Sequence, residues 1–174
     1  MSSFMETMFV RRPWVMLALG AVLVAAPLVP EAHAKRTKSF VKTFVDGKKL
    51  KASRRGIQGF LAGSSFSIAG ATKPKRGVVR TVTVNCGPVD LTTVPPGTTL
   101  TGCFGSYTEA GGKTGSFRQW TGTGIELTVD SFDGTRVTGS FQGVLVDAST
   151  ANPSDAAATL EGGTFSVALF SLGG

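Results

Sequence analysis

The sequence predicts an all-β fold: one antiparallel β-sandwich or β-barrel domain of about nine to ten short strands, preceded by a cleaved signal peptide. Three observations lead to this prediction. An apolar segment near the N-terminus ends in small residues, apolar residues alternate along most of the remaining chain, and glycine-rich turn signals recur between the alternating segments. Sustained helical periodicity is absent from the sequence after the apolar segment.

The N-terminal segment has the pattern of an export signal. Arg11 and Arg12 precede an apolar run over 14–29, which ends in PEAHA with the small residue Ala34 at its close. A charged start, an apolar middle and an A-x-A end are typical of a removed signal peptide. The run is interrupted by Pro27 and is shorter than the ~18 residues that a membrane anchor needs. The arginine pair leaves twin-arginine export open beside the general route.

The predicted organisation is therefore a signal peptide over 1–34 and a single β-domain over 35–174, located in the periplasm or outside the cell and not spanning a membrane after cleavage. The chain has two cysteines, Cys86 and Cys103. An even number of cysteines in an oxidising compartment indicates a disulfide, and closing this loop is expected to contribute on the order of 3 kcal/mol.

The first half of the predicted domain contains a hairpin and three further strands. SFVKTFV and KLKAS flank Asp46–Gly47, a turn pair that favours a tight hairpin. GFLAG and SFSIAG then supply Phe60, Phe66 and Ile68. VVRTVTVNC places Val78, Val82, Val84 and Cys86 on one face, as expected for a half-buried strand.

The second half predicts two more hairpins and a closing strand. SYTEA and TGSFRQW flank a turn at Gly111–Gly112, and IELTVDSF alternates clearly before the turn Asp133–Gly134. RVTGSFQGVLV and TLEGGTFSVALF follow, with their apolar residues on one face. Longer loops are predicted over 87–99 and 147–158. The apolar faces of these strands are expected to consist of Ile125, Leu127, Val129, Val137, Phe141, Leu145, Phe165, Val167 and Leu169.

A Gly-Ser/Thr-Phe triplet recurs so that Phe117, Phe141 and Phe165 are each 24 residues apart. The predicted structure between the first two phenylalanines (a turn, a strand and a turn) differs from that between the last two (a strand end and a long loop). A modular repeat is therefore not expected. The triplet is better explained locally, because a strand glycine leaves a gap that a neighbouring aromatic ring can cover.

Several catalytic classes are excluded by residue type. The single histidine, His33, lies in the predicted signal peptide, so the mature chain cannot form a Ser-His-Asp triad, a Cys-His pair or an H-E-x-x-H zinc site. A disulfide would also remove the thiolates. The remaining catalytic option is a carboxylate pair drawn from Glu126, Asp130, Asp133 and Asp147, as in glycoside hydrolysis. We expect no enzyme activity, no cofactor and no metal site.

Charge is distributed unevenly along the chain. Residues 35–80 contain 13 Lys or Arg and one acid, whereas 81–174 contain 3 bases and 8 acids. Such asymmetry predicts contact with an anionic surface, here anionic lipid head groups or acidic polysaccharide. The alternative is that these bases are only a solvated face or pair with the acidic half. The candidate binding residues are Lys48, Lys49, Lys51, Arg54, Arg55, Lys73, Lys75 and Arg76.

Specific nucleic-acid binding is not expected. Single-strand binders place stacking aromatic residues beside bases on an exposed face. Phe60, Phe66 and Phe117 are predicted to lie in the core, which leaves Trp120 alone as an exposed platform.

Three stretches, FVKTFVDGKKLKAS, VTGSFQGVLVD and LEGGTFSVALF, resemble a broad class of exported bacterial β-rich proteins and lipoproteins of undetermined function. The resemblance implies a small β-sandwich or barrel in the bacterial envelope, and it implies no catalytic residues. The chain departs from that class by lacking the lipid-attachment cysteine that many members carry.

The sequence thus favours an exported non-enzymatic β-domain with a binding or structural role. One alternative is a β-barrel that carries a small apolar ligand in its lumen. The other is a carboxylate-dependent hydrolase of glycans.

Overall fold

The structure is a computed structural model that describes residues 38–112, 115–148 and 157–171. The predicted signal peptide over 1–34 and most of the predicted loop over 147–158 lie outside these residues. The described chain is almost entirely β-structure, with one short 3-10 helix, η1 (Arg54–Gly56). The strands are β1 (Phe40–Val45), β2 (Lys48–Lys51), β3 (Ile57–Ala62), β4 (Ser65–Ala71), β5 (Val78–Cys86), β6 (Thr98–Gly111), β7 (Ser116–Phe132), β8 (Arg136–Asp147), β9 (Ala157–Ala168) and β10 (Phe170–Ser171).

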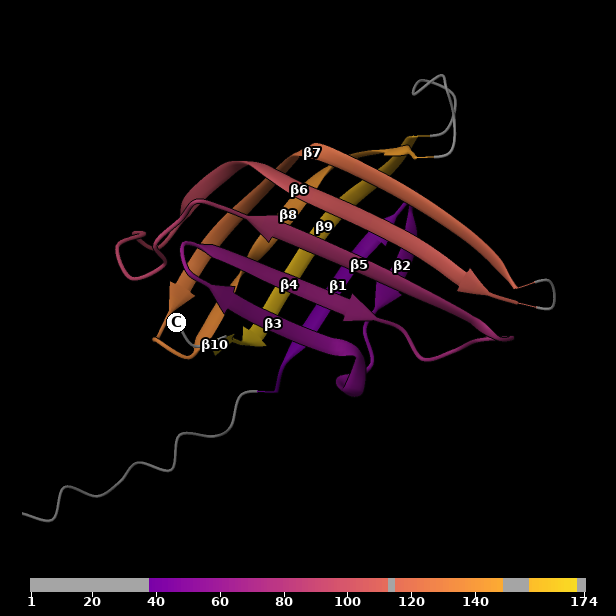
Figure 1. Cartoon of the computed structure of the whole chain (residues 1–174), viewed down its shortest axis with the longest axis horizontal. Helices are drawn as coiled ribbons and strands as arrows, with labels where there is room; N and C mark the ends of the chain where they lie inside the picture. The colour runs from indigo at the N-terminus through magenta and orange to yellow at the C-terminus, as the bar shows by residue number, and fades with distance from the viewer. Residues whose placement is uncertain (1–37, 113–114, 149–156, 172–174) are drawn as a thin grey trace, which may run out of the picture. The chain divides into compact units, whose positions relative to one another are not determined.

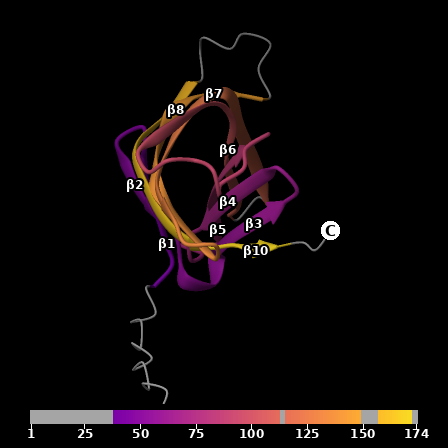
Figure 2. The ribbon, with the colours of Figure 1, turned by 90° about the vertical axis from the view of Figure 1, so that its left-hand side faces the viewer.

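All ten strands belong to one sheet, in the order β10-β3-β4-β5-β6-β7-β8-β9-β1-β2. Strands β3 to β9 form an antiparallel meander, and the β1–β2 hairpin pairs antiparallel with the free side of β9. The two-residue β10 pairs parallel with β3. The sheet curls into a half-barrel, as the end-on view of Figure 2 shows. The prediction of an all-β antiparallel domain is confirmed, and its form is a single curled sheet.

Glycines allow the curled sheet to bring distant strands together. A Cβ on Gly70 of β4 would lie 2.8 Å from the Cβ of Val41 in β1. A Cβ on Gly59 of β3 would lie 2.6 Å from Cγ1 of Val167 in β9. Backbone of β3 and β4 can therefore approach β1 and β9 only because these positions have no side chain.

The core lies on the concave face of the sheet. Alternation predicted this face correctly: Ile125, Leu127 and Val129 of β7 are buried, as are Val137, Phe141 and Leu145 of β8. Burial of these side chains is the main favourable contribution to folding. The other large, fully buried side chains are Val41, Phe66, Ile68, Val82, Val84, Leu160 and Phe165.

The local explanation of the repeated triplet is supported by two glycine–phenylalanine pairs. A Cβ on Gly139 would lie 2.8 Å from Cζ of Phe165, and a Cβ on Gly163 would lie 2.7 Å from the ring of Phe141. The two rings are neighbours, with centroids 6.3 Å apart. Each ring thus covers the glycine of the other triplet on the adjacent strand, and no modular repeat is needed.

Two predictions about the chain around Phe117 are wrong. Phe117 was expected in the core, but its side chain is 64% exposed. It is the second residue of β7, and its side chain is on the opposite face of the strand from the buried Trp120. The sequence was also expected to break between TGSFRQW and IELTVDSF. Instead β7 is continuous, and the Gly122–Gly124 stretch forms an irregularity within it, where the register with β8 shifts between Thr121 and Glu126.

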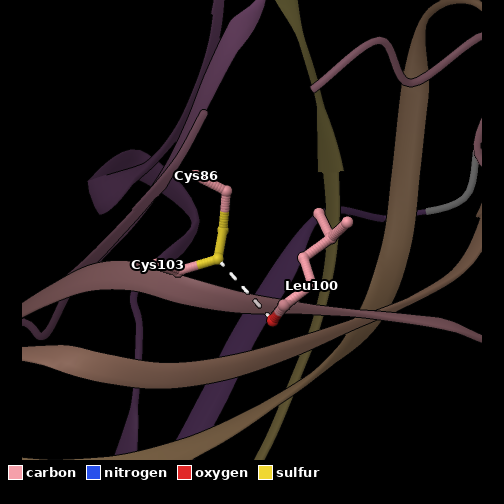
Figure 3. The surroundings of a disulfide bond; sticks show 3 residues. All are labelled: Cys86, Leu100 and Cys103. Atoms are coloured by element: carbon pink, nitrogen blue, oxygen red, sulfur yellow. Dashed lines mark hydrogen bonds between the residues drawn. A yellow bond between two sulfur atoms is a disulfide. The ribbon is translucent and has the colours of Figure 1, made fainter. Parts of the chain in front are cut away.

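The predicted disulfide is confirmed between Cys86, the last residue of β5, and Cys103 in β6 (Figure 3). The cysteines are 17 residues apart in sequence. Cys103 lies at a register irregularity between β6 and β7, and its Sγ is 3.9 Å from the carbonyl oxygen of Leu100. The bridge closes the loop over 87–97 at its base. Among the described residues, no helix has the length and apolar character needed to span a membrane.

Candidate functional site: a basic rim at one end of the half-barrel

The turn of the β1–β2 hairpin, the loop over 72–77 and the adjoining ends of β6 and β7 lie at the same end of the sheet, and η1 packs against the end of β4 there. In Figure 1 the loop over 72–77 and these ends of β6 and β7 are at the right. The strand register supports this placement, because Arg80 is opposite Glu109, and Glu109 is opposite Arg118. We call the basic residues at this end the basic rim: Lys48, Lys49, Arg54, Arg55, Lys73, Lys75, Arg76, Arg80 and Arg118.

The β1–β2 hairpin is held to this end by a turn that the sequence predicted. Asp46 and Gly47 both have positive φ, 48° and 70°, as a tight type I′ turn requires. Asp46 also fixes the hairpin to β9, because its Oδ1 accepts a 2.9 Å hydrogen bond from the amide of Thr159. Lys48 and Lys49 therefore follow a turn whose position is defined by the neighbouring strand.

The first groove of the rim joins two basic segments that are distant in sequence. The amide of Ser53 donates a 2.8 Å hydrogen bond to the carbonyl of Ala71, and Gly56 packs directly on Ala71. This contact seats η1 on the end of β4. The resulting groove, of about 740 Å³, is lined by Ser53, Arg54, Arg55, Thr72, Lys73 and Pro74. Its lining contains three cations and no acid, so it is suited to an anionic group.

The second groove is formed by the turn between β4 and β5. Lys75 and Val78 exchange backbone hydrogen bonds of 3.0 Å, and the turn between them is completed by Arg76 and Gly77 with φ of 53° and 79°. The groove has a volume of about 320 Å³ and is lined by Lys75, Arg76, Val78 and Arg80. Like the first groove, it has basic side chains without an acid.

The third hollow is the mouth pocket, at the end of the concave face. It has a volume of about 210 Å³ and is lined by Val45, Asp46, Lys48, Lys49, Leu50, Arg80, Tyr107, Glu109, Arg118 and Trp120. This volume is below the range of roughly 300–1,000 Å³ of pockets for drug-sized ligands. It therefore fits one small unit of a ligand. Arg80 lines both the mouth pocket and the second groove, so the two are adjacent.

A hydrogen-bonded triad of Arg80, Tyr107 and Glu109 fixes one wall of the mouth pocket. Oε1 of Glu109 accepts hydrogen bonds from Nε of Arg80 at 2.7 Å and from the hydroxyl of Tyr107 at 2.6 Å. Burial acts to raise the pKa of Glu109, but the hydrogen bonds from Tyr107 and Arg80 outweigh it and hold this pKa below its ordinary value. The pKa of Arg80 is raised, chiefly by its hydrogen bond to Glu109. Glu109 is thus a stable anion that orients the Arg80 guanidinium.

Two aromatic rings form the floor of the mouth pocket. The rings of Tyr107 and Trp120 lie 5.2 Å apart between centroids, and the side chains are only 5% and 8% exposed. The guanidinium of Arg118 lies over the Trp120 ring at 4.7 Å, a cation–π arrangement. Its Nη2 is 3.9 Å from Oδ2 of the buried Asp147. The side chain of Arg118 is 59% exposed, so it remains accessible from solvent.

The structure distributes the predicted anion-binding residues, except Lys51, over the three hollows and does not place them in one site. Lys51 lies opposite Lys42 in the β1–β2 pair, away from the end of the sheet, and lines none of the three hollows. The remaining seven line one or another of the hollows. Of the described residues, these seven form no ion pair with an acid.

Sequence reasoning missed Arg80, Tyr107, Glu109 and Arg118 as site residues. Their positions carried a signal, because Arg80 has the same strand parity as the buried Val82 and Val84, and Arg118 has that of Trp120. A charged residue on the core face of a strand, near its end, indicates an inward-facing group at the mouth of a curled sheet. Trp120, the one aromatic residue that the sequence left as a candidate platform, is buried and lies beneath Arg118.

The carboxylates considered for catalysis are spread over different parts of the sheet. Asp147 is buried near Arg118, whereas Glu126 and Asp130 are exposed on β7. Asp133 occupies the β7–β8 turn, where its Oδ1 accepts hydrogen bonds from the amides of Thr135 and Arg136. These contacts lower the pKa of Asp133 and stabilise its turn.

No family model, curated protein or solved structure matches this chain. The geometry and charge of the basic rim are therefore the features from which a function can be inferred.

Proposed function

We propose that the protein is an exported, non-enzymatic binding domain whose basic rim holds an acidic polysaccharide. The observation that carries this proposal is the row of hollows at one end of the sheet, into which Lys and Arg side chains from separate segments converge. Basic side chains that lack an internal partner attract anions from solution. Inside the sheet, by contrast, the concave face is occupied by packed core side chains.

The form of the rim favours a polymer over a flat membrane surface. Each hollow can receive one carboxylate-bearing unit, and Arg54, Arg55, Arg76, Arg80 and Arg118 offer planar forks that match carboxylates. Exposed apolar side chains at this end would favour a membrane, and among the described residues the large ones there are Phe117 and Phe44, which is opposite Lys49. Anionic lipid head groups are therefore the alternative that the experiment distinguishes.

Export is part of the same proposal. The Cys86–Cys103 disulfide is compatible with an oxidising compartment such as the periplasm or the extracellular space. The N-terminal pattern of charged, apolar and small residues supplies the export signal in this proposal.

The test measures binding of the purified protein to polygalacturonate, with neutral dextran and vesicles of anionic phospholipid as parallel probes. We expect saturable binding to polygalacturonate that weakens as salt rises, since a Debye length of about 8 Å at physiological salt screens surface charges. Lys73→Gln/Lys75→Gln should weaken binding by about tenfold or more, since a basic residue near an anionic surface contributes about 1 kcal/mol. The matched control is Lys38→Gln/Lys42→Gln, which removes the same charge outside the rim.

Equal weakening by both double variants would show that net charge, and not the rim, determines binding. Binding to anionic vesicles but not to polygalacturonate would replace the polysaccharide by a lipid surface. The absence of salt-sensitive binding to either probe would reduce the rim to a solvated face. Both double variants should keep the unfolding free energy within about 0.5 kcal/mol, because exposed charges contribute little to folding.

A further inference from the structure

The convex face of the sheet carries a hollow that the basic rim does not include. Its cause is a β-bulge in β9. Lys42 of β1 is paired with Thr164 of β9, and Phe44 is paired with Glu161. Between these pairs β1 has one residue and β9 has two, so β9 contains one extra residue. The same extra residue appears against β8, where Phe141 and Gly143 are paired with Gly163 and Leu160. A bulge of this kind bends the strand and re-aims its side chains, and bulges are frequent near functional sites.

Two glycines keep the bulge open. Gly162 has φ of 54°, a left-handed conformation that side chains disfavour. A Cβ on Gly163 would collide with the carbonyl oxygen of Phe141. The result is a hollow of about 390 Å³ on the convex face, lined by Thr99, Glu126, Thr128, Ser140, Phe141, Gln142, Gly162, Gly163 and Thr164.

One side of this hollow is a row of hydroxyl groups that crosses four strands in register. Thr99 of β6 pairs with Thr128 of β7, Thr128 with Ser140 of β8, and Ser140 with Thr164 of β9. The hydroxyls of Thr99 and Thr128 are hydrogen-bonded at 2.9 Å. Each hydroxyl can both donate and accept, so the row can match several orientations of a ligand hydroxyl.

Glu126 and Gln142 form the other polar side. Nε2 of Gln142 donates a 3.0 Å hydrogen bond to Oε2 of Glu126, which holds the amide and the carboxylate side by side on neighbouring strands. The carboxylate keeps further lone pairs, and the amide keeps a second N–H and a carbonyl oxygen. The pair therefore presents adjacent acceptors and one donor to the hollow.

An aromatic ring borders the hollow at the bulge. A Cβ on Gly162 would lie 3.8 Å from Cδ2 of Phe44, so the ring of Phe44 stands next to the glycine. Phe44 is 40% exposed although it is a large apolar residue. Its ring offers an apolar surface beside groups that form hydrogen bonds.

We propose that this hollow binds one unit of a neutral oligosaccharide. Its lining supplies acceptors for ring hydroxyls from Glu126 and Gln142 and adaptable hydroxyls from the row. Phe44, which is next to Gly162 at the border of the hollow, offers an aromatic edge for the C–H face of a sugar. An anion is disfavoured, because the lining has a carboxylate and no base. A metal cation would find a single carboxylate that is already bonded to Gln142.

This binding site is separate from the basic rim and does not rest on the proposed function of the rim. The residues of the hollow and those of the three rim hollows do not overlap. Binding to the hollow depends on hydrogen bonds, so it should respond little to salt, whereas binding to the rim should respond strongly. Failure of one proposal therefore leaves the other intact.

The experiment titrates the full chain with cellohexaose and maltohexaose and follows the side-chain amide resonance of Gln142 by NMR, assigned through its loss in Gln142→Ala. We expect a saturable shift of this resonance with at least one of the two hexasaccharides, unchanged by added salt. Glu126→Ala/Gln142→Ala, measured by calorimetry, should weaken binding by about tenfold or more, because two hydrogen-bonding side chains are removed.

The matched control is Ser131→Ala/Thr138→Ala, which removes another hydrogen-bonded pair of β7 and β8, at 2.7 Å, outside the hollow. This variant and Lys73→Gln/Lys75→Gln should bind the hexasaccharide as the unaltered protein does. Phe44→Ala should weaken binding and Phe44→Tyr should retain it, which provides a second test if the first double variant is poorly folded. Absence of saturable binding to both sugars, or equal losses in the hollow variant and its control, would overturn the proposal.

Discussion

The two ends of the half-barrel treat their charged residues differently. At the end opposite the basic rim, Asp90 accepts hydrogen bonds from the amide and the hydroxyl of Thr92, and Asp133 accepts them from Thr135 and Arg136. These hydrogen bonds lower the pKa of both carboxyl groups. The acids there serve the turns of their own chain, as Asx-type turns commonly do.

At the rim, most charges have no such internal role. Arg80 and Arg118 pair with Glu109 and Asp147, but within the described chain the other rim bases have no acidic partner. Basic residues gathered without acidic partners repel each other, which costs stability unless an anion is bound. The comparison teaches that side-chain charge at one end is used for folding, whereas most of the charge at the other end has no such use and is where we propose that an anion binds.

The disulfide gives the largest test of this comparison, because it lies at the end opposite the rim. Replacing both Cys86 and Cys103 by Ser should lower the free energy of unfolding by about 2–5 kcal/mol. Chemical denaturation with and without reductant measures the loss. If the double variant remains folded, its affinity for polygalacturonate should equal that of the unaltered protein. A loss of affinity in the folded variant would show that the two ends are coupled.

Glu109→Gln gives the next largest effect and tests the shorter of the two ion pairs at the rim, Arg80–Glu109. Removing the charge shared by Arg80 and Tyr107 should cost about 1–2 kcal/mol at neutral pH, in view of its partial exposure. Because the folded-state pKa of Glu109 is lowered, its stabilisation is present above an unfolded pKa of about 4.3 and is lost as pH falls through the folded value. The variant and the unaltered protein should therefore converge in stability in acid.

The control for this prediction is Glu126→Gln, which makes the same change at an exposed strand position and should shift the unfolding free energy by no more than about 0.5 kcal/mol. An equal effect of both variants across the pH range would contradict the role given to the triad.

The ionisation of Tyr107 in alkali tests the hydrogen-bonded triad at the rim, and at neutral pH it has no effect on stability. Burial, together with the hydrogen bond to the Glu109 carboxylate, raises the pKa of Tyr107 well above its ordinary value of about 10. Its contribution is present below the unfolded pKa and is lost as pH rises toward the folded value. Tyr107 is the single tyrosine of the chain, so the ultraviolet absorbance of tyrosinate reports it alone. Tyrosinate should form only as the protein unfolds in alkali, and a reversible titration near pH 10 in the folded state would contradict this.

Local sequence patterns predicted the hairpin turns and the buried faces. Asp46–Gly47, Gly111–Gly112 and Asp133–Gly134 all connect antiparallel neighbours, because glycine at a turn and alternation beside it are properties of short segments. The continuity of β7 was missed, since Gly122 and Gly124 have the composition of a turn. Whether such glycines end a strand or form a bulge depends on the partner strand, which no local pattern identifies.

In the candidate sites, too, local sequence predicted some features, and others depend on contacts between distant segments. The sequence located the basic segments, and it could not show that Arg54 and Lys73 share a groove, because that depends on η1 packing against the end of β4. The exposure of Phe117 and the inward position of Arg118 follow from parity and from distance to the sheet end. The convex hollow could not be predicted from the sequence, because the bulge in β9 is defined only by its register with β1 and β8.

The strand order has a consequence for how the molecule is made. Strand β1 of the hairpin pairs with β9. One hydrogen bond between them, from the hydroxyl of Thr43 to the carbonyl oxygen of Glu161, joins residues that are 118 positions apart in sequence. An isolated two-stranded hairpin is at best marginally stable in water. The hairpin is synthesised before the other described strands, and it is fixed in place only when β9 has formed. Contacts between residues so distant in sequence slow folding. The wall of the mouth pocket that holds Lys48 and Lys49 is thus complete only when nearly the whole chain has been synthesised and, in an exported protein, delivered across the membrane.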